Sequence, residues 1–570
     1  MANIKSASPR CAVVSPPLSG ISSENPRSGG ATEMENFRFS ADGAIEKRWG
    51  YTPTLGLKGK PRAIFSGYVR GKEERFFLIR DEVFCETPEQ FPGYTLVGRV
   101  ESVEGDAAFV SFLGDLYLLD GKHVYLYTGN GLEIVEGYIP LYGDGWDPIL
   151  RGEICEAENR MTPRLRIRYR NPNGEKNLYF GRKAVQIDRA VIDGEELLAS
   201  EITIINDGYG CTSAAFEYAL DIEVLLVAAR ESDASIEQST GVFSFGRASD
   251  NCLFCYGGDD PTVVYASRGV LPSAADASDL FGRTIGGRLY FSVDDPPYRL
   301  QAPLTAVCRH NDRVLLFTAE GTWGVECEGD RFSVVTVHPS MGCDKKNGAL
   351  LCMNTPITCF GGKLLRFNEK LNRASECSAE VISAPVADVM QEICMHPITM
   401  AYYRASGELW IAAENDAPGR VLIYHPERGV FYTYTGIYLD RLLPSSGEAS
   451  FCKDGTLYAL DRSSNRDCGT REIVARYRTG YFSFGDEGKR KRFLGFTGEV
   501  VPDGGRILLR VKGDCGGAAP FTLSGKGSAD LPLHVEGRRR FGRFRYLSCS
   551  IVCPGEARQR IVALKLFAKV

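Results

Sequence analysis

Short apolar segments that run into a Gly or Asp turn recur along the chain from about residue 60. In each segment the turn is followed by Leu or Val and then by an apolar or aromatic residue. Turn residues that tolerate positive φ between two apolar runs predict tight β-hairpins. The segments are Phe112–Tyr117, Ile285–Tyr290, His310–Leu315, Phe360–Leu365, Ala405–Trp410 and Lys453–Tyr458.

The spacing of these turns predicts a repeat. Asp312, Gly362, Gly407 and Gly455 follow one another at intervals of 50, 45 and 48 residues. A period of about 40–50 residues, with about four short strands per unit, is typical of β-propeller blades. The alternative interpretation is a β protein with many hairpins and no repeat, because short turn patterns also recur by chance.

The repeat is interrupted twice, which predicts the domain organisation. Between Gly114 and Gly287 lie 173 residues, more than three periods, with a strand pattern at 164–169 and an acidic helix expected near 193–200. The repeat ends near residue 470, beyond which further strands form a β-sandwich or, alternatively, close the last blade. We predict an all-β chain: a β-propeller with an inserted β-rich domain and a C-terminal β-sandwich-like region. Its parts are an extended arm (1–35), the first part of the propeller (36–146), the inserted domain (147–238), the second part of the propeller (239–470) and the C-terminal β region (471–570).

Composition agrees with this pattern, and charge adds one local feature. Gly and Pro make up 90 of 570 residues, and the net charge is −5, so no global positive field attracts nucleic acid. The local exception is a run of arginines with interleaved aromatics that includes Arg538, Arg540 and Arg543. One interpretation is a strand whose arginines point to solvent, and the other is a surface that faces DNA or a protein partner.

No constellation in the sequence predicts catalysis, a cofactor or a metal. The nucleophile-elbow, phosphate-loop and zinc-protease helix motifs are all missing from the sequence. The 18 cysteines are scattered, and the pair Cys252 and Cys255 lacks the second pair that a structural zinc site needs. We therefore expect free thiols and folding in a reducing compartment. Without an apolar signal segment or membrane span, we expect no secretion by the classical route.

Acidic pairs leave an enzymatic alternative open. Asp144, Asp259 and Asp294 each belong to a pair of nearby carboxylates, which could act in glycoside hydrolysis or bind calcium. Asp before Pro is also common in turns. Residues Thr318–Trp323 are similar to the Asp-box of sialidase propellers, with Glu320 in place of Asp. That motif is a structural turn, so it supports a blade and not hydrolysis.

Residues 34–51 resemble the start of bacteriophage virion propellers, especially tail nozzle proteins. The arm Leu18–Ser22 is followed by Asn36, Asp42-Gly43, Lys47-Arg48 and Gly50, with Trp49 at a position where Pro is usual. Stretches within 288–343 and 477–492 are similar to the same class, and together the similar stretches cover about a third of the chain.

The resemblance implies a non-enzymatic structural subunit of a phage tail, assembled in the host cytoplasm. Such a subunit would form a ring with copies of itself and bind the tail adaptor and fibre or spike proteins. Genome DNA would pass through its channel without sequence readout. The candidate interface residues are Leu18, Gly20 and Ile21 in the arm and Arg538, Arg540 and Arg543 near the C-terminus. The alternatives are a propeller that hydrolyses cell-surface glycan and a virion propeller that binds a host receptor.

Overall fold

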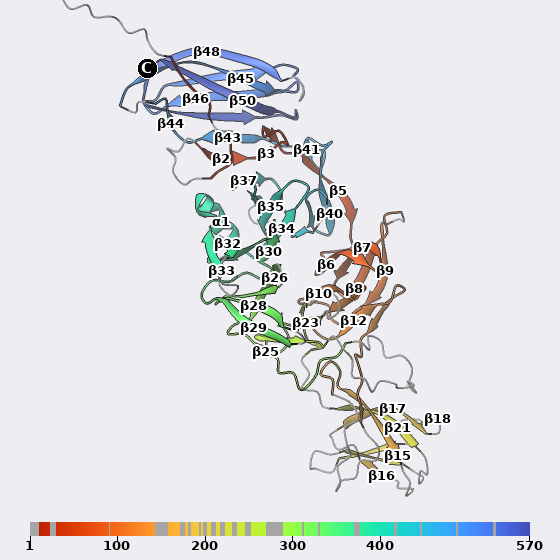
Figure 1. Ribbon diagram of the computed structural model, residues 1–570. Helices are drawn as coiled ribbons and strands as arrows, with labels where there is room; N and C mark the ends of the chain where they lie inside the picture. The colour runs from red at the N-terminus through yellow and green to blue at the C-terminus, as the bar shows by residue number, and fades with distance from the viewer. Residues whose placement is uncertain are drawn as a thin grey trace, which may run out of the picture. The chain divides into compact units, whose positions relative to one another are not determined.

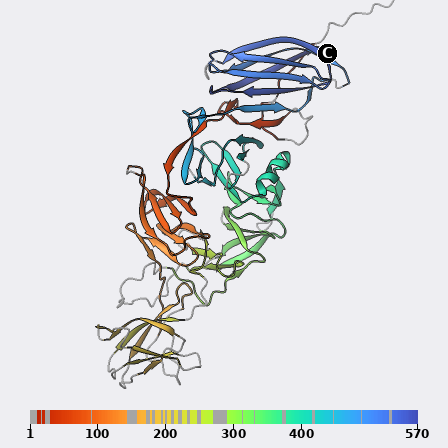
Figure 2. The ribbon, with the colours of Figure 1, turned by 180° about the vertical axis from the view of Figure 1, so that it is seen from behind.

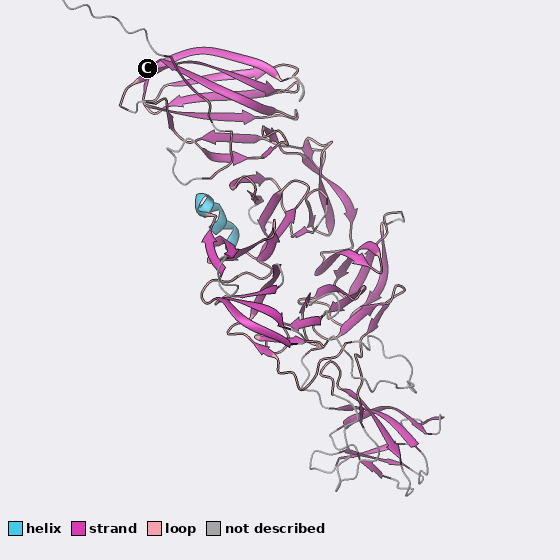
Figure 3. Cartoon of the chain, viewed as in Figure 1, coloured by secondary structure: helices cyan, strands magenta, loops and turns pink. Residues whose placement is uncertain are grey.

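The computed structural model consists almost entirely of β-strands (Figure 3). It describes residues 11–569 except 17, 23–29, 90–91, 143–157, 171–176, 180–183, 193–194, 198–201, 207–211, 217–222, 231–235, 246–251, 269–288, 311–312, 329–330, 370–376, 415–418, 445–446, 486–487 and 528–531. The chain divides into two compact units. The first comprises Met1–Lys60, Thr305–Gly324 and Thr336–Val570, and the second comprises Pro61–Leu304 and Val325–Val335.

The second unit contains three four-stranded antiparallel sheets, each built from strands in chain order. Their first strands, β6, β10 and β22, contact one another in succession. The strands are β6 (Ala63–Val69), β7 (Lys72–Ile79), β8 (Glu82–Glu86) and β9 (Tyr94–Arg99); β10 (Ala108–Phe112), β11 (Asp115–Leu119), β12 (Val124–Tyr127) and β13 (Leu132–Ile134); and β22 (Gly241–Phe245), β23 (Cys252–Tyr256), β24 (Val263–Ala266) and β25 (Tyr298–Arg299).

The first unit repeats this arrangement, with β30 and β34 labelled in Figure 1, and its first strands β30, β34 and β38 again contact one another in succession. Its strands are β30 (Ala349–Cys352), β31 (Thr355–Phe360), β32 (Lys363–Glu369) and β33 (Cys377–Val381); β34 (Ile398–Tyr403), β35 (Glu408–Ala413), β36 (Arg420–His425) and β37 (Val430–Thr435); and β38 (Arg441–Leu443), β39 (Ser450–Lys453), β40 (Thr456–Asp461) and β5 (Gly50–Gly56). A further sheet, divided between the units, comprises β26 (Leu304–His310), β27 (Arg313–Thr318), β28 (Thr322–Glu328) and β29 (Arg331–His338).

Successive four-stranded sheets that pack through their first strands define a β-propeller, so the predicted fold class is confirmed. The described residues form seven groups of four strands, and within each unit three of them contact one another through their first strands. The outer strand of the last sheet is β5, from the N-terminal part of the chain, which pairs with β40 from Gly50 opposite Asp461 to Gly56 opposite Thr456. The last blade is therefore completed by an N-terminal strand. The alternative prediction, that strands beyond residue 470 close the last blade, is wrong.

The predicted turns at Gly114, Gly362, Gly407 and Gly455 are present, but they do not mark equivalent places in the blades. Gly114 and Gly407 join the first and second strands of their sheets, whereas Gly362 and Gly455 join the second and third. All four have positive φ, as the turn chemistry requires. Asp312 and residues 285–288 lie outside the described residues. These four turns each mark a hairpin in a different blade, but their spacing did not reveal the true blade boundaries.

Between β13 and β22 the chain forms the inserted β-rich region. One sheet has the order β14-β15-β21-β17-β18 and the other β16-β20-β19. The helix expected near 193–200 is wrong, because Glu195–Leu197 is a strand that pairs with the end of β17. The strands are β14 (Leu141–Tyr142), β15 (Arg164–Arg170), β16 (Asn177–Tyr179), β17 (Ala184–Ile192), β18 (Glu195–Leu197), β19 (Ile202–Asn206), β20 (Thr212–Phe216) and β21 (Glu223–Arg230).

The C-terminal strands form a sandwich of two sheets, drawn in blue and seen from behind in Figure 2. N-terminal strands take part in both sheets, so residues 31–47, assigned above to the arm and the propeller, belong to the sandwich. One sheet has the order β3-β4-β50-β45-β48, with β1 beside β50, and the other includes β2-β43-β49-β46-β47, with β44 beside β49. The strands are β1 (Cys11–Val14), β2 (Ala31–Glu35), β3 (Phe37–Phe39), β4 (Ile45–Lys47), β43 (Ala475–Thr479), β44 (Phe482–Ser483), β45 (Lys491–Val501), β46 (Arg506–Gly513), β47 (Ala518–Ser524), β48 (Leu533–Phe544), β49 (Tyr546–Cys553) and β50 (Arg560–Lys569).

A buried polar network joins the sandwich to the last two blades. Both terminal nitrogens of Arg48 donate to the carboxylate of Asp467, at 2.8 and 2.7 Å, and both side chains are almost fully buried. Arg48 Nε also donates to Asn36 Oδ1 at 2.9 Å. The Asn36 amide then donates to Thr435 Oγ1 and Val474 O, both at 2.9 Å. Asn36 and Arg48, in the segment that resembles nozzle proteins, therefore join this segment to Thr435 and to residues 467–474.

Trp49, which occupies the position where Pro is usual in nozzle proteins, lies among three guanidinium groups. The ring centroid is 3.6 Å from Arg38, 4.9 Å from Arg462 and 5.6 Å from Arg558. The face of an indole attracts cations. A proline could not make these contacts, so Trp49 has a structural role here.

Lys47 is buried, and its ammonium donates to the backbone oxygens of Gly555 and Ala557. Burial lowers the pKa of Lys47 from 10.5 to about 8, although Cys553 and Glu472 oppose this shift. The unfolded chain therefore binds more protons than the folded chain between about pH 8 and 10.5.

This difference predicts that Lys47 makes the protein more stable as the pH rises from 8 to 10.5. The measurement is the free energy of unfolding against pH for the wild type and Lys47→Met. The variant should show a smaller rise across this range, because the titrating group is gone. Parallel curves for the two proteins would contradict the assignment.

Candidate functional site

The candidate interface residues of the arm lie against the chain's own propeller. Ile21 N–H donates to Phe431 O at 2.8 Å, and Phe431 N–H donates to Ile21 O at 2.9 Å. Gly20 lies so close to the blade that a Cβ would come within 2.8 Å of Phe431 O. Leu18 and Ile21 pack against the core that the sandwich shares with the blades. These residues anchor the arm within its own chain, and their contact with a neighbouring subunit stays a prediction.

The second group of candidate residues lies on β48, which is an edge strand of its sheet. Arg538, Arg540 and Arg543 are exposed, as is Arg539 between them. Two register shifts in the pairing of β48 with β45 explain why consecutive arginines are exposed instead of alternating between the two faces. The interpretation of a strand with arginines toward solvent is therefore consistent with the structure.

Register places cations from three strands side by side. On β45, Arg492 is directly opposite Arg543 of β48 on one side and Lys569 of β50 on the other. All three side chains are exposed. Directly opposed residues have Cβ atoms about 4.5–5.5 Å apart, and like charges in such positions repel. We call Arg543, Arg492 and Lys569 the cationic row.

The C-terminal part of the chain, which contains the cationic row, is richer in positive than in negative charge. Residues 471–570 contain 20 Lys and Arg against nine Asp and Glu, whereas the whole chain contains 67 against 72. Among the described residues, no carboxylate makes an ion pair with a member of the row or with Arg538 or Arg540. The arginines of β48 could be recognised from the sequence because they are consecutive. Arg492 and Lys569 could not, since their proximity to Arg543 depends on strand register.

The acidic residues of the enzymatic alternative occupy turns where they are described. Asp260 accepts hydrogen bonds from Thr262 N–H and Oγ1 and pairs with Arg299 at 2.8 Å. Asp295 binds the guanidinium of Arg268 through both oxygens, at 2.5 and 2.7 Å. Asp144 and Asp147 lie outside the described residues. These contacts are typical of turn capping.

The sequence similar to the Asp-box forms the turn between β27 and β28. Thr318 Oγ1 accepts hydrogen bonds from the backbone N–H groups of Glu320 and Gly321, at 3.1 and 3.2 Å. Trp323 is almost fully buried. The motif is therefore a structural turn in a blade, as the sequence indicates.

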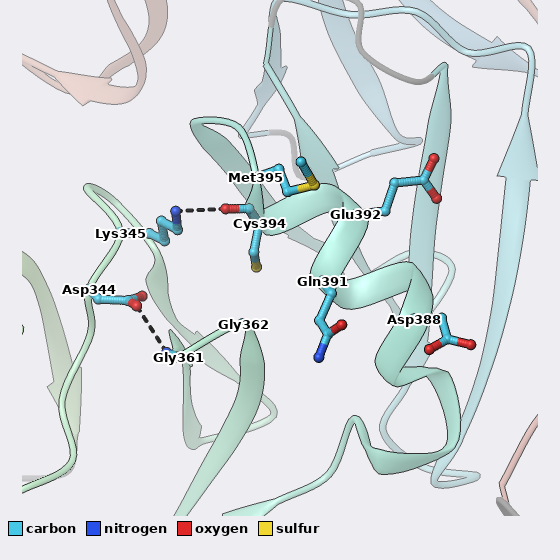
Figure 4. Close-up of a pocket in the computed structure, with 9 residues that line it drawn as sticks. All are labelled: Asp344, Lys345, Gly361, Gly362, Asp388, Gln391, Glu392, Cys394 and Met395. Atoms are coloured by element: carbon cyan, nitrogen blue, oxygen red, sulfur yellow. Dashed lines mark hydrogen bonds between the residues drawn. The ribbon is translucent and has the colours of Figure 1, made fainter.

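A pocket of about 630 Å³ opens beside α1 (Ala387–Cys394), the one α-helix in the described part of the chain (Figure 4). Its lining includes charged residues of α1, Asp388 and Glu392, and charged residues that precede β30, Asp344 and Lys345. Asp344 accepts the N–H of Gly361 at 2.9 Å, and Lys345 Nζ donates to Cys394 O at 2.7 Å. The residues that line it are Asp344, Lys345, Gly361, Gly362, Asp388, Gln391, Glu392, Cys394 and Met395. Neither α1 nor the pocket beside it was predicted from the sequence.

The described cysteines are free thiols, most of them buried. Cys252 and Cys255 both lie on β23 and are fully buried, and burial alone raises the pKa of Cys255 to about 12. In the described ranges no three His, Cys, Asp or Glu residues gather in a way that could hold a metal ion. None of the helical residues that the structure describes forms a segment long and apolar enough to cross a bilayer.

Comparison with known proteins adds no family to this description. No family model and no curated protein matches the chain. Solved structures similar to it include "YCF48 bound to D1 peptide", with 10% identity over 75% of this chain and 99% of that chain and a TM-score of 0.37. The WD40 domain of SCAP from fission yeast has 8% identity over 73% of this chain and 98% of that chain, with a TM-score of 0.30. These TM-scores are too low to support a conclusion about the fold or the function of this chain. The propeller assignment rests on the sheets described above.

Proposed function

We propose that the protein is a structural subunit of a bacteriophage tail, of the nozzle type, which acts by binding other virion components through its surfaces. The resemblance of residues 34–51 to nozzle proteins motivates this proposal, and the propeller fold is compatible with it. In this role the subunit forms a ring with its own copies, binds the adaptor and fibre or spike proteins, and lets the genome DNA pass.

The observation that carries the proposal is the cationic row. Three directly opposed cations on neighbouring strands repel one another, so the folded chain retains an arrangement that costs stability. An anionic partner would offset this cost and gain from the complementary field. The row therefore supports a function in binding at the outer face of this sheet.

The first test is assembly. The purified protein should form rings in negative-stain images and show a mass in solution of several subunits. A protein that stays monomeric and does not associate with tail particles that lack it would overturn the proposal. Hydrolysis of a glycan by the purified protein would instead favour the enzymatic alternative.

The second test concerns the cationic row itself. The double variant Arg492→Glu with Arg543→Glu should bind tail particles at least about tenfold more weakly, because two attractive charges become repulsive. A pull-down on tail particles with quantified bound protein measures this change. The matched control is Arg506→Glu with Arg510→Glu, two exposed arginines of β46 in the other sheet of the sandwich. Equal loss in both double variants would show that net charge, and not the row, determines binding.

A further inference from the structure

Two thiols face each other at the pocket beside α1. Cys359 lies on β31 and Cys394 is the last residue of α1, and their sulfur atoms are 3.2 Å apart. Both are free thiols. Cys359 is fully buried, whereas Cys394 is partly exposed and lines the pocket, as Figure 4 shows. One thiol is thus accessible to a small molecule, and the other lies directly behind it.

The surroundings make the two thiols chemically unequal. The hydrogen bond between the two thiols and the nearby ammonium of Lys345 lower the pKa of Cys394, against opposing effects of burial and of Asp344. For Cys359 the same pairing with Cys394, together with burial and the neighbouring Cys343 and Asp344, raises the pKa. Cys394 is therefore the thiol that loses its proton more readily of the two. An accessible thiolate with a second thiol in reach is the arrangement that thiol–disulfide exchange needs.

We propose that Cys394 and Cys359 form a thiol–disulfide exchange site that reacts with low-molecular-weight disulfides, and this inference is independent of the proposed function. The Cys394 thiolate attacks one sulfur of the small disulfide, whose S–S bond breaks and releases one thiolate. Cys359 then loses its proton to solvent and attacks Cys394 in the mixed disulfide, which releases the second thiolate. The pair is oxidised to a Cys359–Cys394 disulfide, and the small disulfide is reduced to two thiols.

The new bond would fasten α1 to the blade beneath it. Met390 and Ile393 of α1 already pack in one core with Cys359 and with residues of β34–β37. Helix α1 leads from the sheet β30–β33 to the sheet β34–β37. A covalent link across 35 positions restricts the unfolded chain. Oxidation is therefore expected to protect the connection between these two blades against unfolding and proteolysis.

The test exposes the full-length native protein to oxidised glutathione, blocks the remaining thiols by alkylation and maps the linked peptides by mass spectrometry. The wild type should contain a Cys359–Cys394 crosslink and no glutathione at either position. Cys359→Ser should retain glutathione on Cys394, because the second step is lost. Cys394→Ser should leave Cys359 unmodified, because that thiol is buried. The exposed Cys11, Cys468 and Cys515 serve as internal controls that take up glutathione without this crosslink.

A second variant tests the role of the ammonium without removing a thiol. Lys345→Met should slow the alkylation of Cys394 at least about threefold at neutral pH, since the thiolate loses its neighbouring charge. Lys346→Met, which removes a charge from the same loop away from the pocket lining, should leave the rate unchanged. The absence of a crosslink in the native wild type, or equal reactivity of Cys359 and Cys394 in the single variants, would overturn the proposal.

Discussion

Replacing Asp467 by Asn should lower the free energy of unfolding of the first unit by about 3 kcal/mol. The carboxylate accepts two hydrogen bonds from Arg48, and the exposed fractions of the two side chains are only 3% and 1%. The substitution leaves a buried guanidinium without its counter-charge, which costs far more than the loss of an exposed pair. Denaturant unfolding, followed by the fluorescence of Trp49, Trp323 and Trp410 in this unit, measures the change.

The control is an ion pair of similar geometry at the surface. Arg366 and Glu380 approach to 2.6 Å, but their side chains are 36% and 52% exposed. Glu380→Gln should therefore cost less than about 1 kcal/mol. If Asp467→Asn were no more destabilising than Glu380→Gln, the network around Arg48 would not be what joins the sandwich to the blades.

Gly50→Ala should destabilise the same unit by about 3 kcal/mol, because a methyl group has no space at this position. Its Cβ would lie 2.0 Å from Arg466 O and 2.5 Å from Arg466 C, and both are backbone atoms that cannot move alone. The clash lies at the first residue of β5, so the pairing with β40 should weaken. Hydrogen exchange of the β5 amides should accelerate together with the loss of stability.

The same strand supplies a matched control for this prediction. Gly56, the last residue of β5, would have nothing within 4 Å of its Cβ. Gly56→Ala should therefore change the stability by no more than about 0.5 kcal/mol. Similar effects of the two substitutions would show that β5 tolerates adjustment along its whole length and that close approach at Gly50 is not a constraint.

Local chemistry made part of the fold predictable. Gly362 and Gly455 lie in turns that need positive φ, and the residues on either side alternate as hairpin strands do. The assignment of β2 to β5 could not be predicted in this way. Glu35 pairs with Thr433 and Gly50 with Asp461, so their partners are about four hundred positions away, and no short-range pattern encodes such a pairing.

The candidate sites show the same contrast between features that lie close together in the sequence and features that depend on long-range pairing. Consecutive arginines on β48 were visible in the sequence, whereas Arg492 and Lys569 join them only through register. The thiol pair was missed because Cys394 depends on a helix of eight residues, too short to give a strong periodic signal. Sites within one strand could thus be anticipated, and sites assembled from several elements could not.

The completion of the last blade by β5 has a consequence for synthesis of the protein on the ribosome. Thr54 Oγ1 of β5 donates to Leu457 O of β40, which is translated 403 positions later. At about 5–20 residues per second, the ribosome needs about 20–80 s to reach that point. The nascent chain therefore carries β5 without its partner for most of its translation. A strand that is among the first to be made is among the last to be paired, and throughout that interval it offers an open edge to other nascent chains.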